Sequence, residues 1–231
     1  MGSKIGVRDN ISPEEWQYRI DNLVYSQSLL SCFKRNRGEF VDKYIRNIFW
    51  SDETEKDLEY EKNMSYGLDF HLECERIFMG ISDREDGHFK RIMQIKQKYE
   101  KENKNLEFCP ECKIETDSSI SATLDLLVKI YDDDNNLKEV SIWDWKVENV
   151  EITYERALRR MQTAVYMYIV KETVAKNIDF DKVRMYYYQP GINKNQRIVY
   201  SEELHNRFKN NIFSTINEIK NMDRNEEYDE C

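Results

Sequence analysis

The chain contains 231 residues, of which 40% are hydrophobic and 13% aromatic, and this composition predicts a globular protein with one substantial core. The sequence has no apolar run of bilayer-spanning length and no secretory leader, and five scattered cysteines argue against a secreted disulfide framework, so we expect a cytoplasmic protein without membrane contact. A net charge of −9 counts against a tight, free-standing DNA-binding protein, because neutralisation of phosphates by basic side chains normally dominates such binding.

The first 24 residues are expected to form a leader and a short helix. Residues 1–10 are typical of a disordered leader, and Ser12 is well placed to cap a helix from Pro13 to about Asn22. A second serine-capped helix is predicted next, and it carries basic residues as far as Arg46. Exposure to solvent is sufficient to explain such a basic face.

Another helix is predicted downstream of the mixed-charge segment 52–62, which is itself expected to be a linker or an exposed helix start. Apolar residues recur at helical spacing between Phe70 and Phe78. His71 and Glu75 lie four residues apart on this helix, so both side chains can point toward one site.

Two strongly charged segments differ in sign. Residues 88–104 are basic and are expected to be helical, whereas residues 223–231 form an acidic tail. A local basic groove can coexist with an acidic protein, although a solvated helix face and a frayed terminus also explain these segments.

A strand is predicted to follow the basic helix, and it contains the spacing Cys109-Pro110-Glu111-Cys112. Two cysteines at this spacing invite a zinc or iron–sulfur interpretation, but such a site needs about four soft ligands. The other three cysteines form no second close pair, so an iron–sulfur cluster is not expected.

A hairpin of two strands is predicted between residues 119 and 146, around a turn rich in aspartate and asparagine. Asp125 lies on the first strand, and Asp144 and Lys146 share one face of the second because side chains two residues apart on a strand point the same way. Trp143 and Trp145 are expected to point the other way, into packing. Two carboxylates and a lysine suit a Mg²⁺ or Mn²⁺ site for attack on a phosphodiester, although a surface hairpin with exposed charges has the same pattern.

A helix that continues to about Lys176 follows this hairpin, and its residues Gln162 and Tyr166 lie on one face. Residues 182–191 and 196–201 then predict a second hairpin around a Pro-Gly turn, and residues 201–222 predict an amphipathic terminal helix.

These motifs resemble the RecB-like branch of the PD-(D/E)XK nuclease superfamily. The segments ATLDLL, IWDWK and MQTAVY match its D, DxK and QxxxY motifs in the same order, with Asp125, Asp144, Lys146, Gln162 and Tyr166 at the motif positions. The upstream segments YSQSLL and GLDFH extend the resemblance, which covers about residues 25–200. The domain is therefore predicted to span residues 25–222.

The resemblance implies a restriction-endonuclease-like α/β fold, in which helices flank a mixed sheet of four or five strands in the order αβββαβ beneath an N-terminal helical cap. It also implies a Mg²⁺- or Mn²⁺-dependent DNA nuclease. Lys146 is then the residue that positions the attacking water, while Gln162 and Tyr166 orient Lys146 or contact the phosphate. The implied metal ligands are His71, Asp125, Asp144 and the backbone carbonyl of Trp145, with Glu111 as a further candidate and Glu75 as a weaker one.

We expect exonuclease-like action on single- or double-stranded DNA. We expect this action to take place within a larger complex that includes a helicase or another protein subunit. Three alternatives stay open from the sequence. The first is a catalytically inactive, nuclease-fold subunit that binds DNA. The second is a hydrolase for RNA or nucleotides that uses the same metal chemistry, and the third is an interaction protein whose acidic surface docks a partner.

Overall fold

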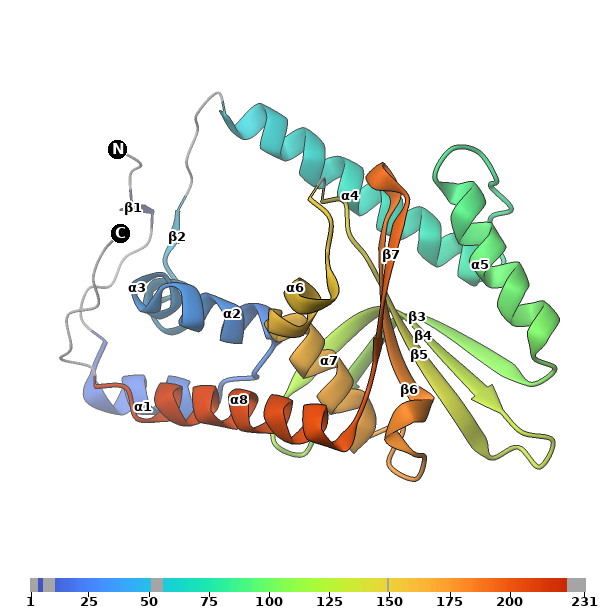
Figure 1. The fold of residues 1–231 in the computed structure, drawn as a ribbon. Helices are drawn as coiled ribbons and strands as arrows, with labels where there is room; N and C mark the ends of the chain where they lie inside the picture. The colour runs from blue at the N-terminus through green and yellow to red at the C-terminus, as the bar shows by residue number, and fades with distance from the viewer. Residues whose placement is uncertain (1–3, 6–10, 51–55, 149, 224–231) are drawn as a thin grey trace.

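The computed structural model describes residues 4–5, 11–50, 56–148 and 150–223. A five-stranded mixed sheet forms the centre, with helices α4 (Lys56–Phe78) and α5 (Phe89–Glu102) on one side and the remaining helices on the other (Figure 1). Most of the predicted leader and of the acidic tail lies outside the described residues. No helix in the described ranges is both long and apolar enough to cross a membrane.

The strands of the main sheet lie in the spatial order β3-β4-β5-β6-β7. Their bounds are β3 (Leu106–Glu115), β4 (Ser121–Tyr131), β5 (Leu137–Trp145), β6 (Val183–Gln189) and β7 (Lys194–Val199). Neighbours are antiparallel except β5 and β6, which are parallel. Parallel neighbours need a crossover connection, here built from α6 (Tyr154–Arg159) and α7 (Met161–Glu172). The predicted mixed sheet and αβββαβ order are therefore confirmed.

Two hydrophobic cores hold the helices against the sheet. The first core, which includes Leu30, Ile142 and Met167, joins the sheet to the N-terminal helices, α6, α7 and α8 (Glu202–Lys220). The second core, which includes Phe70 and Trp145, joins it to α4 and α5. α7 buries nine of its twelve residues because the helices of the first core and the sheet enclose it.

The N-terminal cap is divided more finely than the sequence predicts. It consists of α1 (Pro13–Asp21), α2 (Gln27–Arg35), α3 (Arg37–Phe40) and a π-helical turn at Val41–Arg46. Asn36 divides the predicted basic helix, because its backbone is extended and its side-chain oxygen accepts a hydrogen bond from the Glu39 amide at 2.9 Å.

The ends of two other predicted segments also differ from the structure. Within the predicted leader, β1 (Lys4–Ile5) pairs with β2 (Phe49–Trp50), a long-range contact that local patterns do not reveal. α7 ends at Glu172 and not near Lys176, because the Lys171 ammonium donates hydrogen bonds to carbonyl groups between residues 175 and 178 and stabilises a tight turn there.

Ile142 on β5 provides a test of the first core, because its side chain is fully buried. Ile142→Ala is expected to lower the free energy of unfolding by about 2–5 kcal/mol, since it removes buried apolar contacts and leaves a cavity. Val199→Ala on β7 is the control, because Val199 is 38% exposed and should change stability by less than about 0.5 kcal/mol. Urea unfolding followed by circular dichroism measures both, and equal effects would contradict the assigned core.

Candidate active site

Asp125 lies where strand β4 passes from one core to the other. The ladder pairs Pro110 with Leu126 and Cys112 with Leu124, and it is interrupted between these pairs, at Glu111 and Asp125. Leu124 packs in the first core and Leu126 in the second, although alternate residues of a regular strand share a face. The interruption therefore places the Asp125 carboxylate at the junction of the two layers.

Glu111 lies opposite Asp125 on β3 in the left-handed backbone region, with a φ of 47°. A residue other than glycine in this region is strained by about 1–3 kcal/mol, and such strain is concentrated at functional sites. Burial, together with the negative charge of Asp125, raises the pKa of Glu111. The side chain of Glu111 is thus directed toward the other carboxylate at a cost in stability.

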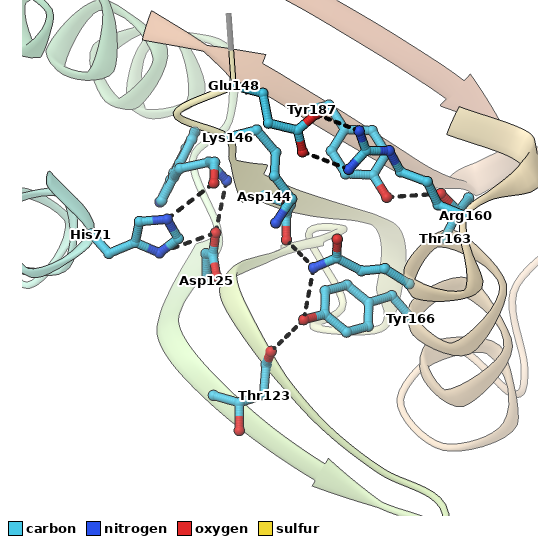
Figure 2. Close-up of polar contacts among 12 residues, drawn as sticks. His71, Thr123, Asp125, Asp144, Lys146, Glu148, Arg160, Thr163, Tyr166 and Tyr187 are labelled. Atoms are coloured by element: carbon cyan, nitrogen blue, oxygen red, sulfur yellow. Dashed lines mark hydrogen bonds and ion pairs between the residues drawn. The ribbon is translucent and has the colours of Figure 1, made fainter. Parts of the chain in front are cut away.

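His71 on α4 contacts both Asp125 and the end of β5 (Figure 2). Its Nε2 lies 3.0 Å from the carbonyl oxygen of Trp145, and its Nδ1 lies 3.4 Å from Oδ2 of Asp125. The same Oδ2 accepts a hydrogen bond from the Trp145 amide at 2.7 Å. Burial lowers the pKa of His71, but the hydrogen bond and charge of Asp125 raise it by more. Because both oxygen atoms are acceptors that face different ring nitrogens, the protonated imidazole can direct one N–H toward each of them.

The side chains of His71, Glu111 and Asp125 form a group whose ligand atoms all lie within 4.8 Å of one another. Imidazole nitrogen and carboxylate oxygen are suitable ligands for a divalent cation. Asp144 is not in this group and lies on the α7 side of Asp125, while His71 lies on the α4 side (Figure 2). Glu75, the weaker candidate from the sequence, is not in the group either.

Asp144 on β5 is a buried carboxylate with no exposed surface. Its Oδ1 accepts a hydrogen bond of 2.6 Å from Gln162, and its Oδ2 lies 2.8 Å from the Lys146 ammonium. Among the described residues, the Lys146 ammonium is the one charged partner of Oδ2, which is otherwise buried. Burial, with the nearby charge of Asp125, raises the pKa of Asp144 well above its usual value. An acceptor of this kind, beside Asp125, fits a metal ligand.

Lys146 follows β5 directly, and its backbone amide donates to the Tyr188 carbonyl at 2.9 Å. Its side chain is 21% exposed, so the ammonium reaches the solvent edge of the site. Burial lowers the pKa of Lys146, but the charges of Asp144 and Asp125 raise it by more. Lys146 is therefore a cation at neutral pH, on the same side of β5 as Asp144. The two tryptophans of this strand pack in the second core, as the sequence predicts.

Gln162 and Tyr166 on α7 hold Asp144 through a chain of hydrogen bonds (Figure 2). The Gln162 amide donates to both Asp144 and the Tyr166 hydroxyl, at 2.6 and 3.1 Å, and the hydroxyl donates to the Thr123 carbonyl at 2.9 Å. The resemblance implied that this pair orients Lys146 or contacts the phosphate. In the structure the Gln162 amide contacts Asp144, which in turn pairs with Lys146. Residues four apart on the helix share a face, but only the packing of α7 determines which partner they meet.

Sequence reasoning missed Gln189, which fixes the segment after Lys146. Its side-chain amide donates to the carbonyl groups of Glu148 and Val150, both at 2.9 Å, and accepts from the Ile152 amide at 2.8 Å. A signal was present, because Gln189 is a polar residue that ends an apolar, tyrosine-rich strand, and a buried amide requires partners.

Arg160 was also missed, and the sequence around it gives no signal. Its guanidinium forms two hydrogen bonds with the Glu148 carboxylate, at 2.8 and 2.6 Å, and lies over the Tyr187 ring. This bidentate pair joins the segment after Lys146 to the start of α7.

Cys109 and Cys112 are half-buried and pack against the first core on either side of Glu111. Burial raises the pKa of the Cys112 thiol to about 12. The potential metal-binding group that includes Glu111 contains neither cysteine.

A mixed sheet flanked by helices, with paired carboxylates and a lysine at the end of a central strand, defines a restriction-endonuclease-like α/β protein. The family model of the PD-(D/E)XK nuclease superfamily matches residues 33–231, and the chain belongs to this superfamily. Proteins of this superfamily generally perform nuclease chemistry with divalent metals. None of the curated proteins compared with the chain matches it.

Metal binding is expected to require Asp125 and Asp144 jointly. Asp125→Asn and Asp144→Asn should each weaken Mn²⁺ binding at least about tenfold, since each removes an anionic oxygen while keeping the side-chain shape. Isothermal titration calorimetry measures the affinity. Thermal unfolding is the control, because Asp144→Asn also leaves the Lys146 ammonium without its paired carboxylate, and the affinities are compared at a temperature where both variants are folded. Wild-type affinity in both variants would exclude this site.

Gln162 is expected to be a positioning residue. Gln162→Ala leaves Oδ1 of Asp144 buried without its donor, so Mn²⁺ affinity should fall about 10- to 100-fold, as for other residues that orient metal ligands. Tyr166→Phe is the matched control, because it keeps Gln162 and should have a smaller effect. The same calorimetric titration tests both variants, and an equal loss in the two would show that Gln162 has no separate role.

Proposed function

We propose that this protein is a divalent-metal-dependent nuclease that hydrolyses phosphodiester bonds of DNA, with Mg²⁺ or Mn²⁺ as the metal. The main support is the surroundings of Asp144. A fully buried carboxylate lies near the charge of Asp125, and one of its oxygens is held 2.8 Å from a protonated lysine at the solvent edge. Two carboxylates placed this close repel each other, and a divalent cation between them would relieve that repulsion.

The residues that hold the metal in this proposal are Asp125, Asp144, His71 and the Trp145 carbonyl, with Glu111 able to join them. When bound there, a divalent cation lowers the pKa of a coordinated water and neutralises charge on the phosphate. His71 would hold the cation through a neutral imidazole nitrogen, so a bound metal would favour the unprotonated side chain.

Lys146 is proposed to orient the attacking water and to stabilise the negative charge that develops on the phosphate oxygens. Its raised pKa keeps it charged, which favours an electrostatic role over a role as a general base. The water is positioned by the ammonium on the solvent side, where the side chain is partly exposed. Gln162 keeps the Asp144 carboxylate in one orientation throughout.

We also propose exonuclease-like action within a larger DNA-processing or defence complex that includes a helicase or another protein subunit. The RecB-like order of the motifs supports cleavage from ends. The net charge of −9 supports a partner, because an acidic protein gains little affinity for DNA from its overall charge. The complete set of Asp125, Asp144 and Lys146 argues against the alternative of an inactive binding subunit.

The proposal is tested by incubating purified protein with linear and circular DNA, single- and double-stranded, in Mg²⁺, Mn²⁺ or EDTA. Loss of linear DNA alone is the expected result, and it must require metal. Nicking of circles would replace the exonuclease assignment with an endonuclease assignment. Absence of cleavage of every DNA, together with cleavage of RNA in the same buffers, would overturn the DNA assignment.

Lys146→Ala separates chemistry from folding and metal binding. Cleavage should fall at least about a hundredfold, because a preorganised cation is removed from the transition state. Mn²⁺ affinity should be kept or should rise, since a like charge beside the metal is removed. Lys182→Ala is the control, because Lys182 is paired with Asp181 in an exposed position. Wild-type rates in the Lys146→Ala protein, measured with separately purified samples, would remove the role proposed for this lysine.

A further inference from the structure

A second site lies on the face of β5 that points away from Asp144. A pocket of about 400 Å³ is enclosed by α5, β5, β6 and β7, and Trp143 forms part of its wall. Trp143 belongs to the second core, whereas Asp144 contacts α7 on the other side of the sheet. The volume is within the range of about 300–1,000 Å³ that is usual for small-ligand sites. The pocket is thus separate from the metal-binding side chains but is built on the same strand.

The lining of this pocket is positively charged, in contrast to the chain as a whole. Two acidic residues, Glu102 and Glu139, line it beside five basic residues, which are Arg91, Lys98, Lys138, Arg184 and Arg197. The chain has a net charge of −9, so the positive charge gathered at this pocket is a local feature. Such a group of cations attracts an anion.

Three of these cations are available to a ligand. Arg91, Lys138 and Arg197 are exposed, and among the described residues none of them forms an ion pair with a carboxylate, although Arg91 donates to the Gln94 side chain at 3.3 Å. Arg184 is paired with Glu139, yet its Nε is a buried donor without an acceptor in the described part of the chain. The guanidinium groups therefore offer unused donors of the kind that bind phosphate oxygens.

An aromatic platform lies beside these cations. The Tyr186 ring stacks on Trp143 with their centroids 4.4 Å apart and their planes at 12°, and Trp143 Nε1 donates to the Tyr99 hydroxyl at 3.1 Å. Tyr186 is half-buried, and all three aromatic residues line the pocket. A fixed, partly exposed ring next to free guanidinium groups is suited to an anion that carries a flat ring of its own.

A second pocket continues this surface along α5. It has a volume of about 480 Å³, shares Arg91 with the first pocket, and is also lined by Lys90 and Tyr188. The Tyr188 carbonyl accepts the backbone hydrogen bond of Lys146. The two pockets therefore adjoin at Arg91 and form a track along α5.

We propose that the pocket between α5 and β5–β7 binds one nucleotide unit, with its base stacked on Tyr186 and its phosphate held by Arg91 and Arg197. The two adjoining pockets assign this unit to a polynucleotide, and that assignment rests on the nuclease function proposed above. A free nucleotide offers the same chemistry in a single unit. The two sources differ in length, because only a chain can occupy both pockets at once.

Binding is measured in EDTA, so that cleavage does not interfere and failure of the nuclease proposal leaves the result unaffected. The probes are a fluorescein-labelled twelve-residue oligothymidylate, thymidine monophosphate and inorganic phosphate. Arg91→Glu and Arg197→Glu are expected to weaken oligonucleotide binding tenfold or more. They should also reduce the slope of log affinity against log salt by about 0.7 for each phosphate that the protein no longer neutralises. Lys101→Glu is the matched control, because Lys101 is exposed on the same helix and does not line the pocket.

Tyr186→Leu and Tyr186→Phe separate stacking from charge. The leucine variant should lose between about fivefold and a hundredfold in affinity with an unchanged salt slope, whereas the phenylalanine variant should bind normally. Equal binding by wild type, Arg91→Glu and Arg197→Glu would overturn the site. Monophosphate binding as tight as oligonucleotide binding would overturn the polynucleotide assignment and leave a free-nucleotide site, and binding of inorganic phosphate alone would overturn the stacking role.

Discussion

Asp144 is a carboxylate without exposed surface, and its burial constrains the elements around it. A buried carboxylate loses its hydration, which favours the protonated form unless donors and cations replace the water. Lys146 and Gln162 provide that replacement, but they come from the end of β5 and from the crossover helix α7. The arrangement therefore exists only when α7 is packed on the sheet. The hydrogen-bond chain from Gln162 through Tyr166 to β4 ties the orientation of the carboxylate to the first core.

Strand β5 serves two different surfaces because its side chains alternate. Asp144 points toward α7, while Trp143 and Trp145 pack in the second core under α4 and α5. The Trp145 backbone, in turn, contacts His71 and Asp125 through its carbonyl and amide groups. The proposed nucleotide pocket and the candidate metal site thus share one rigid strand, although they lie on opposite faces of it. Relative placement of the two sites is fixed by the pleat of β5 and not by a loop.

The sequence was sufficient to predict the order of sheet and helices and the shared face of Asp144 and Lys146, because strand alternation and helical spacing are local properties. The candidate metal ligands came from the resemblance of the motifs. Partners from distant segments were not predictable. Gln162 was expected near Lys146, yet the packing angle of α7 gives it Asp144. Gln189 and the pair of Arg160 with Glu148 act across segments that lie far apart in the chain or fold irregularly. Asn36 could have been recognised as a helix cap, but the basic pattern continued through it and concealed the break.

The acidic net charge and the basic pocket act over different distances. At physiological ionic strength charges are screened beyond about 8 Å, so a phosphate in the pocket interacts mainly with Arg91 and Arg197. The excess of carboxylates elsewhere does not cancel these contacts, but it weakens long-range attraction and slows the encounter with nucleic acid. Affinity then comes from a few local contacts plus stacking, with a shallow dependence on salt. For such a protein, a partner that delivers a strand to the track would raise the encounter rate without any new basic surface, because the contacts that hold the strand are already present in the pocket.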